Sequence, residues 1–301
     1  MDTITDADYI SSFVGERLMA KGVLEAPVSL RRFFQGGTDD PDSKLVFLSG
    51  GRHRFVVTVS PLLFPEVVAE EYLRAGRMRS HLGELGAPIL EPLDTGRIQA
   101  SSYAVLPYRR PLSKRRGVSW FDRLRTTGPL LQWLLQVTQQ RGTVCAASRY
   151  EASLGALRGM ITADSAAAAL LEAGEKHLRS GRFAPRTAPM HGDLWKGNVL
   201  RGAGSAAFTL VDWRGSATDG FPIFDLIRVA WSFGLSPKAL HRELQLHQAA
   251  LGCQEADLPL YLLGALGHYA AHLEEMSLAL FRSMADECVT RLSSALEHKS
   301  S

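Results

Sequence analysis

Two aspartates and one asparagine in the second half of the chain have a spacing that suits metal-assisted chemistry on phosphates. Asp193 lies in the segment MHGDLWKGNVL, and Asn198 follows it by five residues at the start of an apolar strand. A return strand, FTLV, then leads to Asp212. A carboxylate on a short loop can orient a hydroxyl group and accept its proton. An amide oxygen and a second carboxylate can share Mg²⁺, which takes few protein ligands in addition to phosphates. The order of these residues therefore indicates phosphoryl transfer.

The stretch that contains them resembles the catalytic segment of the aminoglycoside phosphotransferase and choline kinase-like family, a small-molecule branch of the protein-kinase fold. The family signature is H-G-D-x-x-x-x-N, then D-W, then G-x-P-x-x-D-L. The chain carries these motifs in that order at residues 191–198, 212–213 and 220–226. A polar β-hairpin whose Asp and Asn residues merely form turns is the alternative interpretation. Three motifs in the family's order favour the resemblance.

The resemblance implies a role for each polar residue of this stretch. Asp193 would be the catalytic aspartate, and Asn198 and Asp212 would hold Mg²⁺. His191 and Asp225 would brace the loop. Catalysis would then depend mostly on positioning and charge, because phosphoryl transfer asks little covalent chemistry of the protein.

An α+β, two-lobed protein-kinase-like fold is also implied by the resemblance. Residues 1–108 would form an N-lobe with a five-stranded antiparallel sheet and a helix, and residues 109–301 a mostly helical C-lobe with the catalytic loop and a substrate groove. Alternation and turn residues predict strands at 27–35, 44–49, 54–60, 88–93 and 98–108, with a turn at 94–96. Helical periodicity marks residues 10–18, 64–85, 120–140, 165–178, 223–233, 237–251, 258–281 and 284–296.

The nucleotide site is expected at the first strand turn and at the end of the fifth strand. In the family, the loop at Gly36, Gly37 and Thr38 closes over the ATP phosphates, where glycine lets backbone N–H groups approach oxygen. Leu106 and Tyr108 are the first and last residues of the expected hinge, whose backbone binds adenine in this fold. Without the downstream motifs, the two glycines would indicate an ordinary hairpin.

The third strand departs from the family pattern, because a lysine that contacts the phosphates is missing from it. Strand alternation puts Thr58 at the expected lysine position, and threonine cannot supply the charge. Glu71 on the next helix resembles the usual partner of that lysine, although it could equally be a solvated helix glutamate. Lys196, three residues after Asp193, is the nearest replacement along the sequence, and Arg214 is the second.

Composition and charge exclude few classes but agree with a globular enzyme. The 301 residues are 46% hydrophobic and 22% charged, and the net charge of +3 does not by itself indicate a nucleic-acid partner. The basic run at residues 109–116 lacks interleaved aromatics and favours a solvated loop between lobes. The acidic start, the interrupted apolar run at 258–271 and three widely spaced cysteines predict a cytoplasmic protein without a membrane span or disulfide framework.

These observations predict a small-molecule kinase that uses ATP and Mg²⁺ and phosphorylates a hydroxyl of a metabolite or antibiotic. The leading alternative is a nucleotide-binding pseudokinase with a sensing or scaffolding role, supported by Thr58. A nucleic-acid-binding module rests on the basic run alone. The sequence identifies neither the acceptor nor the oligomeric state.

A set of polar residues late in the chain permits two interpretations. His268, His272 and Glu275 share one helical face, as zinc ligands do, but Tyr269 stands where an H-E-x-x-H motif needs its glutamate. Lining of the substrate groove is the favoured interpretation. Glu275 and its neighbour Glu274 would then favour a cationic or polyhydroxy substrate.

Overall fold

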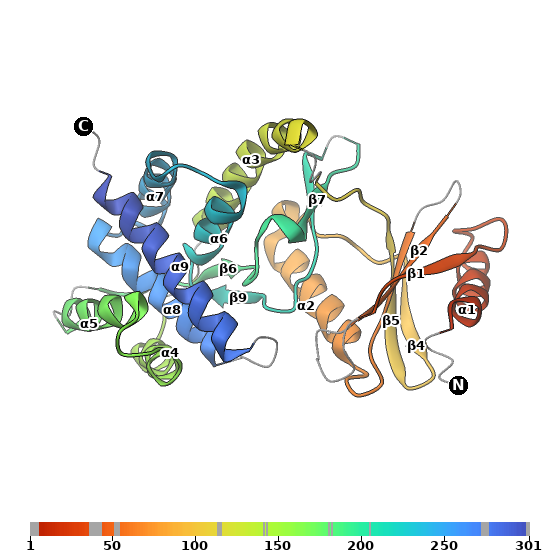
Figure 1. The fold of residues 1–301 in the computed structure, drawn as a ribbon, viewed down its shortest axis with the longest axis horizontal. Helices are drawn as coiled ribbons and strands as arrows, with labels where there is room; N and C mark the ends of the chain where they lie inside the picture. Colours follow the sequence, from red (N-terminus) through yellow and green to blue (C-terminus); the bar gives the residue numbers. More distant parts are fainter. Residues whose placement is uncertain are drawn as a thin grey trace.

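A computed structural model describes most of the chain. The described residues are 6–35, 44–50, 55–112, 116–140, 142, 144–179, 181, 183–204, 206–271 and 277–298, with backbone only at 34, 35 and 116–120. A sheet with one helix on each side lies at one end of an elongated molecule, and most helices lie at the other end (Figure 1). The functional motifs lie where these two parts meet.

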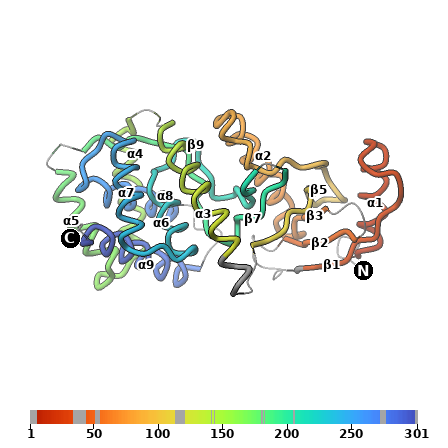
Figure 2. The backbone as a smooth tube through the Cα atoms, turned by 90° about the horizontal axis from the view of Figure 1, so that it is seen from above, coloured from red at the N-terminus to blue at the C-terminus, as the bar shows by residue number. Residues whose placement is uncertain are grey.

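The sheet is five-stranded and antiparallel, which confirms the prediction. Its strands lie in the order β1 (Leu30–Gln35), β2 (Leu45–Ser49), β3 (Phe55–Val59), β5 (Ser101–Pro107) and β4 (Asp94–Ile98). Helix α1 (Ala7–Ala20) and helix α2 (Val67–Leu82) lie on opposite sides of the sheet (Figures 1 and 2). The sheet therefore has one face toward α1 and another toward the rest of the molecule.

Alternation along the strands decides which side chains occupy each face. Phe55, Val57 and Val59 of β3 join the core under α1, together with Ile10 and Val14 of that helix. The residues between them point to the α2 side, because successive side chains in a strand alternate. Thr58 is therefore on the α2 face, as the sequence predicts.

The predicted turn at residues 94–96 is wrong. These residues belong to β4, and the reversal comes after it, at Gln99 with a positive φ of 55°. The reason is the buried carboxylate of Asp94, which accepts hydrogen bonds from Arg17 of α1 (2.7 Å) and from Tyr103 of β5 (2.5 Å). Residues 88–93, predicted as a strand, form only an isolated bridge from Ile89 to Leu210.

The other end of the molecule is mostly helical, as predicted. Its helices are α3 (Arg116–Gln139), α4 (Ala147–Met160), α5 (Ala166–Leu178), α6 (Phe224–Phe233), α7 (Pro237–Leu251), α8 (Leu258–Ala270) and α9 (Leu278–Glu297). Helix α4 was not predicted. The predicted helices at 258–281 and 284–296 differ from the observed α8 and α9 in where the first ends and the second begins. Helix α9 begins earlier, at Leu278, because Ser277 caps it by accepting the N–H of Leu280 at 3.3 Å. In the described part, no helix is long and apolar enough to cross a membrane.

Short strands between α5 and α6 carry the functional motifs. Strands β6 (Ala188–Met190) and β9 (Ala217–Gly220) pair with each other, and β7 (Val199–Arg201) pairs with β8 (Phe208–Leu210). The loop from β6 passes through the one-turn helix η3 (Lys196–Asn198) into β7. Core packing of this hairpin against α2 and α3 fixes the loop between the two parts of the molecule.

Candidate active site

The loop that follows β6 is fastened by the carboxylate of Asp225, in the first turn of α6. One oxygen accepts the backbone N–H of His191 at 2.6 Å, and the other accepts the N–H of Gly192 at 3.1 Å. Gly192 has a φ of 85°, and a Cβ there would lie 2.1 Å from the carbonyl oxygen of Gly215. Only glycine fits at this position, because both the backbone conformation and the close approach exclude a side chain. Burial raises the pKa of Asp225 to about 6.

His191 is buried, and its ring contacts two backbone segments, the catalytic loop and the residue after β8. Its Nε2 lies 3.1 Å from the carbonyl oxygen of Val211, and its Nδ1 lies 3.3 Å from the backbone nitrogen of Asp193. A carbonyl can only accept and an amide N–H can only donate, so the ring carries its proton on Nε2. Burial lowers the pKa of His191 to about 4, which keeps the ring neutral. The neutral ring orients the loop.

The carboxylate of Asp193 lies between two donors. Asn198 donates from Nδ2 to Oδ2 at 3.0 Å, and Arg228 of α6 donates to Oδ1 at 2.8 Å. Burial raises the pKa of Asp193 to about 6, and the Arg228 guanidinium limits this rise. The sequence analysis missed Arg228. The available signal was its position three residues after Asp225, because that spacing puts both side chains on one face of α6.

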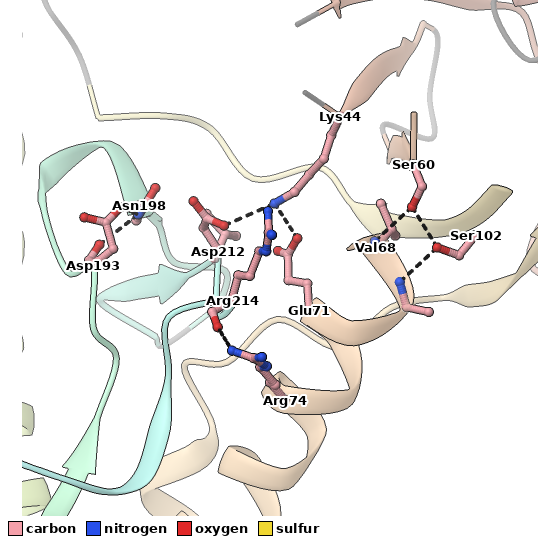
Figure 3. A network of polar contacts seen from close by, with 12 residues as sticks. Lys44, Ser60, Val68, Glu71, Arg74, Ser102, Asp193, Asn198, Asp212 and Arg214 are labelled. Atoms are coloured by element: carbon pink, nitrogen blue, oxygen red, sulfur yellow. Dashed lines mark hydrogen bonds and ion pairs between the residues drawn. The ribbon is translucent and has the colours of Figure 1, made fainter. Parts of the chain in front are cut away.

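Asn198 and Asp212 present oxygen atoms that suit a hard divalent cation. The Nδ2 of Asn198 is occupied by the backbone and side-chain oxygens of Asp193, at 2.8 and 3.0 Å, so its Oδ1 is turned away from them. Asp212 follows β8 with a φ of 66°. The preceding residue, Val211, donates its backbone N–H to the carbonyl oxygen of Asn198 at 3.1 Å, which joins the two segments that carry these side chains (Figure 3). An amide oxygen and a carboxylate match the donor preference of Mg²⁺.

A lysine from the sheet reaches this group of residues. The Nζ of Lys44, immediately before β2, lies 2.6 Å from Oε2 of Glu71 and 3.2 Å from Oδ1 of Asp212 (Figure 3). Glu71 is buried on α2, so one ammonium group joins the sheet, α2 and the loop after β8. Burial alone would raise the pKa of Asp212, but Lys44, together with Arg214, lowers it below its usual value.

Strand register explains how Lys44 comes to this position. Val46 of β2 lies opposite Thr58 of β3, and side chains two residues apart point to the same face. Lys44 is therefore on the same face as Thr58, one strand away. The sequence analysis looked for the cation on β3, in the catalytic loop and, as a second choice, at Arg214, and it assigned Lys44 no role. Aligning β2 and β3 as a hairpin across their predicted turn would have shown that Lys44 and Thr58 share a face.

Lys196 lies near helix α3 and not near Glu71 and Asp212. It begins η3, its backbone N–H donates to the hydroxyl of Ser232 at 3.0 Å, and the charges acting on its side chain come from Asp122 and Arg123 of α3. Burial lowers the pKa of Lys196. The structure therefore brings Lys44, and not Lys196, to Glu71 and Asp212.

The predicted nucleotide contacts are partly within the described structure. Tyr108, directly after β5, lines a cavity of about 440 Å³ together with the start of β1 and the end of β2. Leu106 is buried on β5. Gly36, Gly37 and Thr38 lie outside the described residues.

The polar residues that were predicted to line the substrate groove, with a metal site as the alternative, are not all within the described residues. His268 lies on α8, and it lines a cavity beside the catalytic loop. His272, Glu274 and Glu275 lie outside the described residues. Within the described ranges, no three His, Cys, Asp or Glu side chains are grouped to hold a metal ion.

The fold and the loop geometry define a protein-kinase-like phosphotransferase. A model of the phosphotransferase enzyme family matches residues 32–256, so the chain belongs to this family. None of the curated protein sequences matches the chain significantly.

Solved structures show the same fold at low sequence identity. Choline kinase LicA from Streptococcus pneumoniae is 14% identical, with a TM-score of 0.55 over 95% of this chain and 99% of that one. The aminoglycoside phosphotransferase APH(4)-Ia, in a ternary complex with AMP-PNP and hygromycin B, is 14% identical, with a TM-score of 0.55 over 95% and 98%. Macrolide 2'-phosphotransferase MphH from Brachybacterium faecium is 20% identical, with a TM-score of 0.52 over 93% and 97%.

Proposed function

We propose that this protein transfers the γ-phosphate of MgATP to a hydroxyl group of a small molecule. The observation that carries the proposal is the contact of Lys44 with both Glu71 and Asp212. Thr58 leaves β3 without the cation that a kinase of this family needs, and Lys44 supplies a cation on the same sheet face. A pseudokinase that had lost its phosphate-binding charge would not need this buried ion pair.

Asp193 is the proposed catalytic residue. At neutral pH a carboxyl group with a pKa of about 6 is mostly ionised, so it can hold the acceptor hydroxyl and take its proton as the new bond to phosphorus forms. Arg228 and Asn198 keep the carboxylate in one orientation. Because both donors are attached to rigid elements, the base is positioned before the substrate arrives.

The phosphate side of the reaction is assigned to residues of both parts of the molecule. Lys44 would contact the nucleotide phosphates while Glu71 keeps its ammonium group in place. Asn198 and Asp212 would hold Mg²⁺, whose charge offsets that of the phosphate oxygens. The cavity beside Tyr108 would take the adenine ring, and the similar APH(4)-Ia was solved with the ATP analogue AMP-PNP.

Replacing Asp193 by Asn separates transfer from binding and tests the proposal. Calorimetry should show MgATP binding to both proteins with similar affinity. ADP release with a panel of hydroxylated metabolites and antibiotics should fall by about 100- to 10,000-fold in Asp193→Asn, the range for loss of a general base. The proposal fails if the native protein does not bind MgATP, or if acceptor-dependent ADP release persists in Asp193→Asn.

A further inference from the structure

A second cavity, of about 350 Å³, opens beside the catalytic loop between α2, the segment 214–219 and α8. Three arginines line it: Arg74 and Arg77 come from α2, and Arg214 comes from the chain two residues after Asp212. Arg74 and Arg77 are exposed, one helical turn apart on the same side of α2. Figure 3 shows the Arg214 side chain turned toward Lys44 and Asp212, so the guanidinium groups offered to the cavity are those of Arg74 and Arg77.

This cavity shares its wall with the proposed reaction centre. Arg74 donates to the backbone carbonyl of Arg214, and Arg214 is close enough to Asp212 to lower the pKa of that carboxylate. Figure 3 shows Arg74 below the loop that carries Asp212 and Arg214. Gly215, also on the wall, is in backbone contact with Gly192 of the catalytic loop. A molecule in the cavity would therefore lie next to the loop that bears Asp193.

Among the described residues of the cavity wall, the one acidic side chain is already paired with a cation outside the arginine pair of α2. Asp219 is held by Arg149 of α4, whose guanidinium lies 2.5 Å from its carboxylate. Glu71, one turn before Arg74 on α2, is paired with Lys44 on the other side. The remaining polar lining includes the hydroxyl groups of Ser216 and Thr218, which suit hydrogen bonds to an anion.

We infer that this cavity holds a carboxylate or phosphate group of the phosphoryl acceptor, so that the acceptor is an anionic hydroxylated small molecule. A guanidinium group offers paired donors in a plane that matches both groups. The two guanidinium groups on α2 disfavour a polycationic acceptor by like-charge repulsion. The inference rests on the proposed phosphotransfer, and it differs from the expectation of a cationic substrate that Glu274 and Glu275 suggested in the sequence.

Binding of inorganic phosphate and of malonate in the presence of saturating Mg²⁺ and AMP-PNP tests the inference. The nucleotide analogue fills the γ-phosphate position, so any further anion must bind elsewhere. Calorimetry should show binding of both probes to the native protein and at least about tenfold weaker binding to Arg77→Gln, as expected for a charge-assisted contact. Arg79→Gln is the matched control, because Arg79 is on the same helix but pairs with Glu91 outside the cavity. It should bind both probes like the native protein.

The possible results distinguish this inference from the proposed function. If neither probe binds while MgATP does, or if Arg77→Gln binds them as tightly as Arg79→Gln, the cavity is not an anion site although phosphotransfer stands. If phosphate binds only without nucleotide, it occupies the γ-phosphate position and the inference is overturned. If the probes bind through Arg77 but MgATP does not bind at all, the cavity is an anion site and the proposed function fails.

Discussion

The loop around Asp193 and the sheet face beside it differ in how their charged groups are placed. In the loop, His191, Asp193 and Asn198 come from a short stretch of sequence, and Asp225 of α6 fixes that stretch through two backbone N–H groups. On the sheet face, the cation comes from the residue just before β2 and its partner comes from α2. The loop depends on contacts with its backbone, so its polar residues must stand at fixed positions in the sequence. The sheet face needs only a positive charge at one point in space, so that charge can come from β3 or from a neighbouring strand.

Asp212 is where the two regions meet, so its replacement should have the largest effect on nucleotide binding. Asp212→Asn removes the charge but tolerates the positive φ that alanine would not. We expect Mg²⁺-dependent binding of ATP to weaken by more than about 100-fold, the upper end of what loss of a supporting group costs a metal site. Titration with MgATP and with metal-free ATP would measure it. Equal Mg²⁺ dependence in the variant and native protein would show that Asp212 is no ligand.

Replacing Arg228 should have a smaller effect, limited to the pH dependence of catalysis by Asp193. The catalytic base must be ionised, so kcat/KM should fall about tenfold per unit as the pH drops below about 6, the pKa of Asp193. Arg228 lowers this pKa, so removing its charge raises the pKa. Arg228→Gln should therefore move the acid limb of the profile to higher pH by about one unit or more.

The control for this prediction is Arg242→Gln, because the Arg242 side chain is 80% exposed and its contact with Glu243 is long, at 3.9 Å. The profile of this variant should coincide with that of the native protein. An unchanged acid limb in Arg228→Gln would mean that Asp193 does not titrate as the catalytic base, or that Arg228 does not act on it.

The parts of the molecule that follow local rules could be predicted from the sequence. Four of the five strands of the sheet followed from alternation and turn residues, and the motif spacing located Asp193, Asn198 and Asp212 in neighbouring segments. The turn before β5 was misplaced because Asp94 and Gly96 have turn-forming character. The contact that keeps Asp94 in a strand comes from Arg17, 77 residues earlier in the chain.

The charged contacts between different elements could not be predicted from local sequence patterns. Lys44 and Glu71 are 27 residues apart, and their contact requires the strand register and the orientation of α2 together. The choice of Lys196 relied on nearness along the sequence, whereas η3 directs this residue toward α3. Arg228 would have been found by extending the G-x-P-x-x-D-L motif by one helical turn.

The central claim is that Lys44 replaces the missing cation of β3, and the most direct measurement is kcat/KM for MgATP in three variants. Lys44→Met should lose about 10- to 1,000-fold, or roughly 1.4 to 4 kcal/mol, as expected for a charge-assisted phosphate contact. Lys196→Met should stay within about threefold of the native protein, an effect below roughly 0.7 kcal/mol. Adding Thr58→Lys to Lys44→Met should recover at least about tenfold, because the new lysine lies on the same face as Lys44. Full activity in Lys44→Met, or a larger loss in Lys196→Met, would contradict the claim.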